Sequence, residues 1–269
     1  AFFPAQESLH VLPEEALESM AGKPVIVPHY FGVINTGFIR QLNTIGARAI
    51  SDVTHVLLDT AAMDQMLELS DFVFGSYRKT LPIADGGFLA SRKYTVPLPE
   101  KSARANFAAL RFAGLHSRGL SVIGGFHNTE NLRLFELAER QLEESHPDSH
   151  AMSHLGQAAL ESFEVQAEVR SVAENTRFLK ENLSAGISTP TPLDSLSPLF
   201  FLLFDDRAAA LAQRAKLSGR NIFLPQHWPE IEKVDPEHFS LRSLSVPVDS
   251  RYDCQDMARL LEVLAERSE

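Results

Sequence analysis

The chain has 269 residues, of which 44% are hydrophobic, so it can bury a core in one large domain or two smaller ones. Its 35 acidic and 25 basic residues give a formal net charge of −10, which argues against a surface that follows nucleic-acid phosphates. With one cysteine, Cys254, and no apolar run long enough to span a membrane, the sequence predicts a soluble cytoplasmic protein without nucleic-acid or membrane partners.

Helix and strand patterns alternate over the first third of the chain. They predict helices over residues 13–22, 37–47 and 61–71, and strands over residues 23–32, 48–55, 72–76 and 86–92. Such alternation is typical of an α/β sheet. Polar side chains gather where the predicted strands stop, which is where open α/β sheets bind ligands: His29, Asp52, His55, Ser76 and Lys79.

The rest of the chain begins with helices and then returns to an α/β pattern. Residues 103–183 are mostly helix-forming, and a Pro/Ser-rich loop follows them. Beyond this loop the pattern predicts two strands, at residues 199–204 and 221–225, and two helices, at residues 208–219 and 253–268. The final helix has one apolar stripe, formed by Met257, Leu260, Leu261 and Leu264.

Lys79 stands in the stretch "GSYRKTLPIADGG" and has two interpretations. A lysine between an arginine and a threonine is ordinarily a solvated surface charge. A lysine can instead do covalent chemistry where burial or a cationic neighbour, here Arg78, favours its neutral form. The second interpretation gains weight from Asp52, an acid at the end of the preceding predicted strand.

Three stretches, "VPHYFG", "SDVTH" and "GSYRKTLPIADGG", resemble in order the strand-end motifs of the DegT-type sugar aminotransferase family. The tail "LSVPVDSRYDCQDMARLLEVL" is similar to the closing segment of that family. The resemblance covers most of the chain. It implies the fold of the pyridoxal-phosphate enzymes related to aspartate aminotransferase, with a mostly parallel sheet in the large domain and a smaller C-terminal α/β domain.

The resemblance also implies a division of the chain into a partial cofactor-binding large domain at residues 1–100, linking helices at 101–185 and a small domain at 186–269. The first third of the family's large domain has no counterpart, and the chain has no initiator methionine, so we expect a fragment or a natural truncation. Without that first third, sheet edges would be exposed, and self-association would cover them. The resemblance to the family also implies a homodimer.

The resemblance gives each site residue a role. Lys79 matches the lysine that forms the internal aldimine, a Schiff base, with pyridoxal 5′-phosphate and then moves protons. Asp52 matches the aspartate that pairs with the pyridine nitrogen, although it could also be a helix N-cap. His55 stands where the family usually has glutamine, and Ser76 resembles a phosphate-binding hydroxyl. The implied activity is amino transfer from a small-molecule donor to a keto-sugar or another carbonyl acceptor.

Other interpretations of the sequence remain open. A truncated chain could be a non-catalytic protein with this fold that serves binding or assembly. The S-x-x-K pattern of Ser76 and Lys79 also occurs in penicillin-recognising enzymes, but the S-D-N and K-T-G elements of those enzymes are missing. We expect no metal site, because Pro147 interrupts the histidine series His146, His150 and His154.

Overall fold

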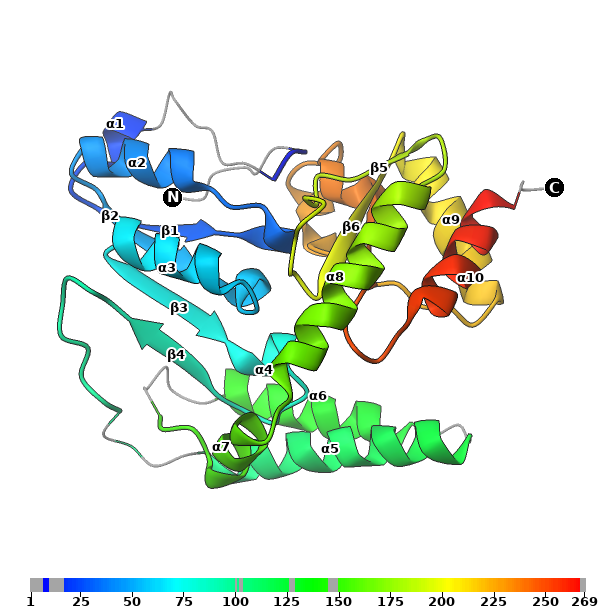
Figure 1. Ribbon diagram of the computed structural model, residues 1–269, viewed down its shortest axis with the longest axis horizontal. Helices are drawn as coiled ribbons and strands as arrows, with labels where there is room; N and C mark the ends of the chain where they lie inside the picture. The colour runs from blue at the N-terminus through cyan, green and yellow to red at the C-terminus, as the bar shows by residue number, and fades with distance from the viewer. Residues whose placement is uncertain are drawn as a thin grey trace. The chain divides into compact units, whose positions relative to one another are not determined.

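The computed structural model describes two compact units. The first unit combines Ala1–Asp71 with Glu164–Glu269, and the second unit is Phe72–Phe163. Each has its own strands and helices (Figure 1). The structure describes residues 7–9, 17–99, 101, 104–125, 129–144 and 150–266.

The N-terminal part of the first unit is built on a parallel strand pair. Strand β1 (Pro24–Pro28) pairs with β2 (Arg48–Asp52) so that Pro28 lies opposite Asp52. Alternate residues of β1 are buried, because successive side chains of a strand point to opposite faces. The other elements here are the helices α1 (Leu17–Met20), α2 (Thr36–Thr44) and α3 (Thr60–Leu69) and the 3₁₀ turns η2 (Tyr30–Gly32) and η3 (Thr54–Val56).

The C-terminal part of the first unit contains an antiparallel sheet in the order β5-β6-β7. Its strands are β5 (Ile187–Ser188), β6 (Leu199–Phe204) and β7 (Ser243–Pro247). All of β6 after Leu199 is buried, because this central strand has apolar side chains on both faces. The part is completed by the helices α8 (Val165–Asn182), α9 (Arg207–Gly219) and α10 (Cys254–Ala265) and the turns η4 (Pro229–Lys233) and η5 (Phe239–Arg242).

An aromatic contact joins the two parts of the first unit. Phe31 in η2 is fully buried, and its ring centroid lies 4.5 Å from that of Phe201 in β6. Phe31 has a φ of 52°, a left-handed conformation that is unfavourable for a bulky residue. Its packing therefore has to hold the turn in place, within a core cluster that also includes Leu9, Val33, Leu203 and Phe239.

The second unit combines a strand hairpin with helices. Strand β3 (Phe72–Ser76) runs antiparallel to β4 (Gly87–Ala90), and the short helix α4 (Tyr77–Thr80) follows β3 directly. Helices α5 (Ala105–Gly124) and α6 (Glu130–Glu143) pack along each other, and α7 (His154–Glu161) ends the unit (Figure 1).

Within the first unit β1 and β2 pair in parallel, and within the second unit β3 and β4 pair antiparallel, so the strands are of the mixed kind found in α/β folds. The predicted α/β fold is confirmed. The closing helix is confirmed as well, because its predicted apolar stripe is buried in α10. The predicted domains, residues 1–100, 101–185 and 186–269, are a different division from the two compact units, and they stay a prediction.

One predicted strand is wrong. Residues 221–225 form no strand, because Asn221 turns the chain at the end of α9 with a φ of 60° and Phe223 is 73% exposed. The Pro225 carbonyl accepts a hydrogen bond from Ser245 N–H at 3.1 Å, but proline has no N–H with which to continue a ladder. The strands that flank β6 are instead β5 and β7, which the sequence pattern did not indicate.

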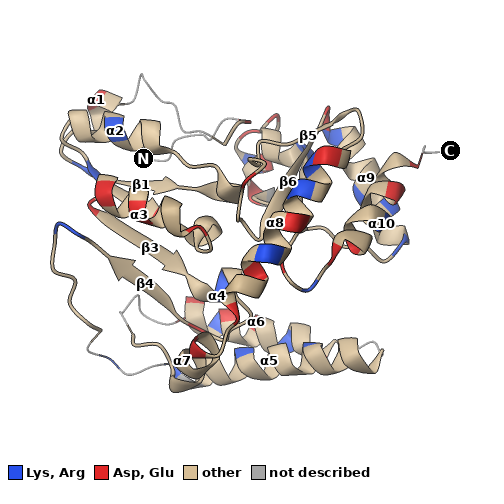
Figure 2. Ribbon diagram, in the orientation of Figure 1, with Lys and Arg blue, Asp and Glu red and all other residues tan. Residues whose placement is uncertain are grey.

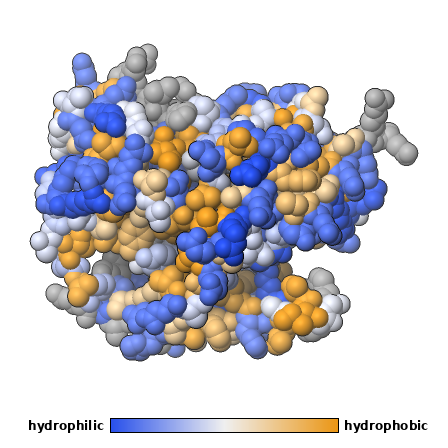
Figure 3. All heavy atoms as spheres, viewed as in Figure 1, coloured by the Kyte–Doolittle hydropathy of each residue, from blue (hydrophilic) through white to orange (hydrophobic). Residues whose placement is uncertain are grey.

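The helices differ in the surface that they present. Acidic and basic residues are interspersed on α8, α9 and α10, whereas α5 is mostly uncharged (Figure 2). Hydrophobic residues gather at the C-terminal end of α5 (Figure 3), where Leu120, Val122 and Ile123 are exposed. None of the described helices combines the length and the apolar character needed to cross a lipid bilayer.

Gly32 provides a test of the packing around η2. Its φ is 81°, and a Cβ atom added there would lie 1.9 Å from Ser195 Oγ. We expect Gly32→Ala to lower the free energy of unfolding, measured by urea denaturation, by about 2 kcal/mol or more. Gly22→Ala is the matched control, because Gly22 has a φ of 69° but open space around it. Equal losses in the two variants would contradict the close approach of Gly32 and Ser195.

Candidate functional site

Each predicted site residue lies at the carboxyl end of a strand. In the first unit, His29 follows β1, Asp52 is the last residue of β2, and His55 is in η3 directly after β2. In the second unit, Ser76 ends β3 and Lys79 is in α4. The structure thus places the residues in two groups, one in each unit, and the juxtaposition of Asp52 and Lys79 stays a prediction.

Asp52 is partly buried and keeps a carboxylate oxygen for a ligand. Its Oδ1 accepts a hydrogen bond from Thr54 N–H at 3.0 Å, and its backbone carbonyl accepts one from His29 N–H at 3.1 Å. Among the described residues, Thr54 is the hydrogen-bond donor to this carboxylate, which leaves Oδ2 available. The N-cap position of η3 is Val53. Asp52 precedes the N-cap by one residue, and its carboxylate stabilises η3 by accepting the hydrogen bond from Thr54.

His29 is a structural residue of this site. It is 1% exposed, and its Nδ1 accepts a hydrogen bond from Asn35 N–H at 3.1 Å. The proton of the neutral ring is therefore on Nε2, which donates to Ser51 Oγ at 3.1 Å. Burial lowers the pKa of His29 to about 4, against the opposing influence of the nearby Asp52 charge.

His55 supports the η2 turn. Its Nδ1 accepts a hydrogen bond from Phe31 N–H at 3.1 Å. Its ring meets the rings of Tyr30 and Phe31 edge-on, with centroid distances of 5.7 and 5.0 Å. The imidazole thus connects the turn after β2 to the turn after β1.

Three residues near this cluster were not among the predicted site residues: Tyr30, His227 and Trp228. Trp228 has a left-handed φ of 52°, and its ring centroid lies 4.9 Å from that of Tyr30. His227 lies edge-on to Phe31 at 5.1 Å and hydrogen-bonds Ser245 Oγ at 2.7 Å. Burial, and secondarily the Asp52 charge, raises the pKa of Tyr30, while burial lowers the pKa of His227. Aromatic residues directly beside histidines, in "HYFG" and "QHWP", are the sequence signal that could have identified them.

Lys79 is exposed, and it lies on the last turn of a helix only four residues long. Ser76 precedes it by three residues and occupies the N-cap position of α4, where its side chain makes no capping hydrogen bond. Ser76 itself has an extended backbone, with a φ of −109° and a ψ of 109°, so the helical turn begins only after it.

The Asp-Gly-Gly sequence after Lys79 fixes the hairpin rather than a ligand. Asp85 accepts hydrogen bonds from Ser153 N–H at 2.8 Å and Ser153 Oγ–H at 2.7 Å. Gly86 has a φ of 105°, and a Cβ atom there would lie 2.6 Å from the Met152 sulfur. The Gly86 carbonyl accepts a hydrogen bond from Tyr77 N–H at 3.1 Å, which ties the hairpin to the first residue of α4.

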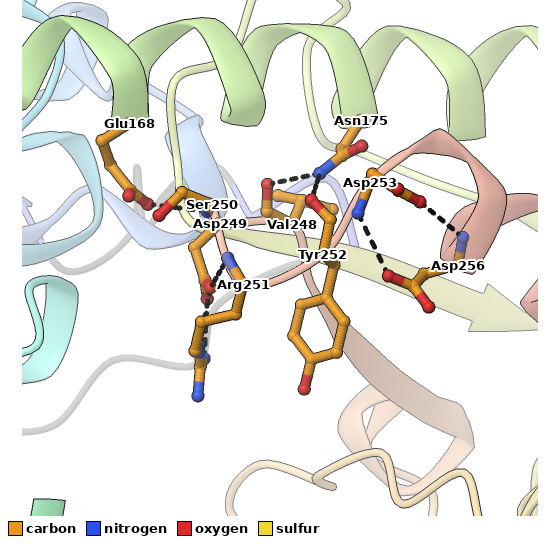
Figure 4. Close-up of polar contacts among 9 residues, drawn as sticks. All are labelled: Glu168, Asn175, Val248, Asp249, Ser250, Arg251, Tyr252, Asp253 and Asp256. Atoms are coloured by element: carbon orange, nitrogen blue, oxygen red, sulfur yellow. Dashed lines mark hydrogen bonds and ion pairs between the residues drawn. The ribbon is translucent and has the colours of Figure 1, made fainter. Parts of the chain in front are cut away.

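Arg251, in the loop after β7, is paired within the chain. Its Nε and one terminal nitrogen donate to the two carboxylate oxygens of Asp249 at 2.6 and 2.7 Å (Figure 4). The surrounding loop is held on α8, because Glu168 accepts from Ser250 N–H at 3.2 Å and Asn175 donates to the carbonyls of Val248 and Tyr252. The close-up therefore favours an ion pair that shapes the loop.

In the described part of the chain, no group of three or more His, Cys, Asp or Glu residues could hold a metal ion. Of the three histidines considered for such a site, His146 lies outside the described residues.

Several solved structures are similar to this chain. The putative sugar aminotransferase Spr1654 from Streptococcus pneumoniae, in its PMP form, has a TM-score of 0.61 at 11% identity, over 98% of this chain and 74% of that one. A DegT DnrJ EryC1 StrS aminotransferase from Brucella abortus has a TM-score of 0.59 at 12% identity, over 98% and 72%. The chain has the fold of the DegT-type aminotransferases. A NifS-like protein from Rickettsia africae has a TM-score of 0.55 at 14% identity, over 97% and 67%.

These similarities confirm the predicted fold. No protein-family model matches the sequence, and no curated protein matches it either. The chain spans 67% to 74% of the length of the three solved structures. We therefore treat any activity of this chain as a proposal.

The buried His29 gives folding stability a pH dependence. The pKa of His29 is about 4 in the folded chain against the ordinary histidine value of 6.5, so the unfolded chain binds more protons between these pH values. This contribution to stability is complete above pH 6.5 and is lost as the pH falls toward 4, by about 3 kcal/mol at most. Urea denaturation at several pH values should give a smaller loss for His29→Gln than for the wild type. Parallel losses in the two proteins would contradict a buried neutral His29.

Proposed function

We propose that this protein is a pyridoxal-phosphate-dependent aminotransferase in which Lys79 holds the cofactor and Asp52 pairs with its ring nitrogen. The observation that carries the proposal is the fold shared with two aminotransferases over 98% of the chain, with Asp52 and Lys79 at the ends of consecutive strands of that fold. One of these two structures is a PMP form, which supports the choice of cofactor.

The residues present fit this cofactor. Asp52 has an available carboxylate oxygen to accept the proton of a pyridinium nitrogen, and partly buried aromatic rings lie beside it. Lys79 is exposed, so its amine can react with an aldehyde. The partly buried Ser76 has a hydroxyl that can donate to a phosphate oxygen, and the His55 ring lies next to those of Tyr30 and Phe31.

Bound pyridoxal phosphate would supply an electron sink for the carbanion formed at the substrate α-carbon. Lys79 Nζ would hold the cofactor covalently and, once released, carry a proton to and from that carbon. Asp52 would keep the ring nitrogen protonated, because a carboxylate beside a pyridinium favours the charged ring. Tyr30, His55 and Trp228 would limit water at the ring face.

The proposal extends to the substrates and the setting. An amino donor such as glutamate and a keto-sugar acceptor are the substrate classes that the likeness to a putative sugar aminotransferase favours. The chain would act in the cytoplasm, where a single unpaired cysteine such as Cys254 is ordinary. The alternative is a non-catalytic protein with this fold that serves binding or assembly.

Lys79→Ala tests the covalent role. Purified wild-type protein mixed with pyridoxal phosphate should gain a visible absorption band, and borohydride should bleach it and leave a modification that mass spectrometry finds on Lys79. The Lys79→Ala variant should lack both, whereas Lys93→Ala, which alters another exposed lysine of the same unit, should keep them.

Asp52→Asn separates binding from catalysis. It should keep the band but lose roughly a hundredfold or more in amino transfer, because the ring nitrogen loses its carboxylate partner. If the wild-type protein gains no visible absorption band with pyridoxal phosphate, the aminotransferase proposal is contradicted. The non-catalytic role in binding or assembly then remains.

We expect the protein to form a homodimer. Self-association would cover two kinds of surface. These are the exposed apolar residues at the end of α5 and the outer edge strands of the sheets. Multi-angle light scattering at micromolar concentration should give twice the mass of one chain. A single peak at the monomer mass would contradict the prediction.

A further inference from the structure

Arg78, the residue directly before Lys79, takes part in an ion cluster with more positive than negative charge. Its two terminal nitrogens donate to Glu139 of α6, at 2.8 Å to Oε1 and 3.3 Å to Oε2. Arg111 of α5 donates to the same Oε1 at 2.7 Å. One carboxylate therefore serves two guanidinium groups, and all three side chains come from the second unit.

The two arginines are mostly removed from water. Their side chains are 17% and 13% exposed, while that of Glu139 is 39% exposed. Each guanidinium lies over an aromatic ring: Arg78 is 5.7 Å from the ring centroid of Phe107, and Arg111 is 5.4 Å from that of Phe135. Aromatic faces orient guanidinium groups without neutralising their charge.

The second positive charge of this cluster lacks a matching anion in the described part of the chain. Arg111 uses one terminal nitrogen, and its buried Nε has no hydrogen-bond partner there. Two other glutamates of α6 pair with arginines of their own helix, Glu130 with Arg133 and Glu136 with Arg140. Burial, together with the charge of Arg78, lowers the pKa of Arg111. A largely buried surplus charge is costly unless an anion compensates it.

We propose that Arg78 and Arg111 form a binding site for a phosphate group, with Glu139 as the intramolecular anion that occupies part of it when no phosphate is bound. Arginine forks match a tetrahedral oxyanion through paired hydrogen bonds. The more exposed Glu139 lies on the accessible side, where an incoming phosphate can displace its carboxylate.

The site lies beside the strand-end junction of Lys79, because Arg78 shares the four-residue helix α4 with that lysine. A ligand whose phosphate binds Arg78 and Arg111 would bring the remainder of its structure toward this junction. The assignment is made from the charges and distances of the second unit alone, so it stands apart from any covalent role of Lys79. The chain as a whole is acidic, with a net charge of −10, so this local surplus differs in sign from the average surface.

Two substitutions with opposite expected effects test the site. Isothermal titration calorimetry of the full chain with inorganic phosphate, at low ionic strength, measures the affinity. Arg111→Gln should weaken phosphate binding roughly tenfold, because it removes charge-assisted hydrogen bonds. Glu139→Gln should strengthen it several-fold, because the competing carboxylate is gone. Arg133→Gln, on the exposed side of α6, is the matched control and should leave the affinity unchanged.

Arg111→Lys keeps the charge but loses the planar fork, and we expect an affinity between those of the wild type and Arg111→Gln. If Glu139→Gln is poorly folded without ligand, its melting temperature is measured with added phosphate, which should raise it more than it raises that of the wild type. Glycerol 3-phosphate is a second probe. Tighter binding of this ester than of inorganic phosphate assigns the site to a phosphate carried by a larger ligand, and equal binding assigns it to the free ion.

A purely structural ion cluster would give a different pattern. Arg111→Gln and Glu139→Gln would then both destabilise the chain, and phosphate would bind neither the wild type nor Glu139→Gln measurably. That pattern would overturn the proposal. Lys79→Ala distinguishes this site from the proposed cofactor role, because it should abolish the cofactor adduct and leave the affinity for phosphate intact.

Discussion

The η2 turn after β1 is the constraint on which the first unit depends. Phe31 is held in a left-handed conformation by its contact with Phe201 and by the hydrogen bond from its N–H to His55. Gly32 then passes so close to Ser195 that a side chain would collide with it. One turn thus fastens the strand pair β1–β2 to the antiparallel sheet β5-β6-β7. The aromatic and histidine residues around Asp52 take their places from the same turn.

The two groups of site residues are supported in different ways. Asp52 lies among buried and partly buried rings, where His29 is neutral and Tyr30 has a raised pKa, so its charge acts in a setting of restricted water. Lys79 lies on a short helix whose position is fixed by hydrogen bonds to the Asp-Gly-Gly hairpin and by the ion pairs of Arg78. Each of the two proposed site residues therefore has a structural residue as its neighbour: His29 beside Asp52, and Arg78 beside Lys79.

The sequence predicts those features that follow from local patterns. Alternating apolar residues locate β1 and β2, and the stripe of α10 emerges from its helical spacing. The role of Trp228 and His227 could not be predicted in this way, because they meet Tyr30 and Phe31 through contacts between residues almost two hundred positions apart. The sequence pattern predicts a strand at residues 221–225 that does not form. An apolar run becomes a strand only where its backbone hydrogen-bonds to a neighbouring strand, and the local pattern does not show this. The sharing of Glu139 by Arg78 and Arg111 likewise depends on three separate helices.

The central proposal is that the Asp52 carboxylate and the Lys79 amine bind the same pyridoxal-phosphate ring. A crystal structure of the full protein, treated with pyridoxal phosphate and then with borohydride, measures this most directly. The account predicts electron density joining Lys79 Nζ to the cofactor, with an Asp52 oxygen at about 2.7–2.9 Å from the ring nitrogen. A cofactor attached to a different residue, or a ring nitrogen far from Asp52, would contradict it.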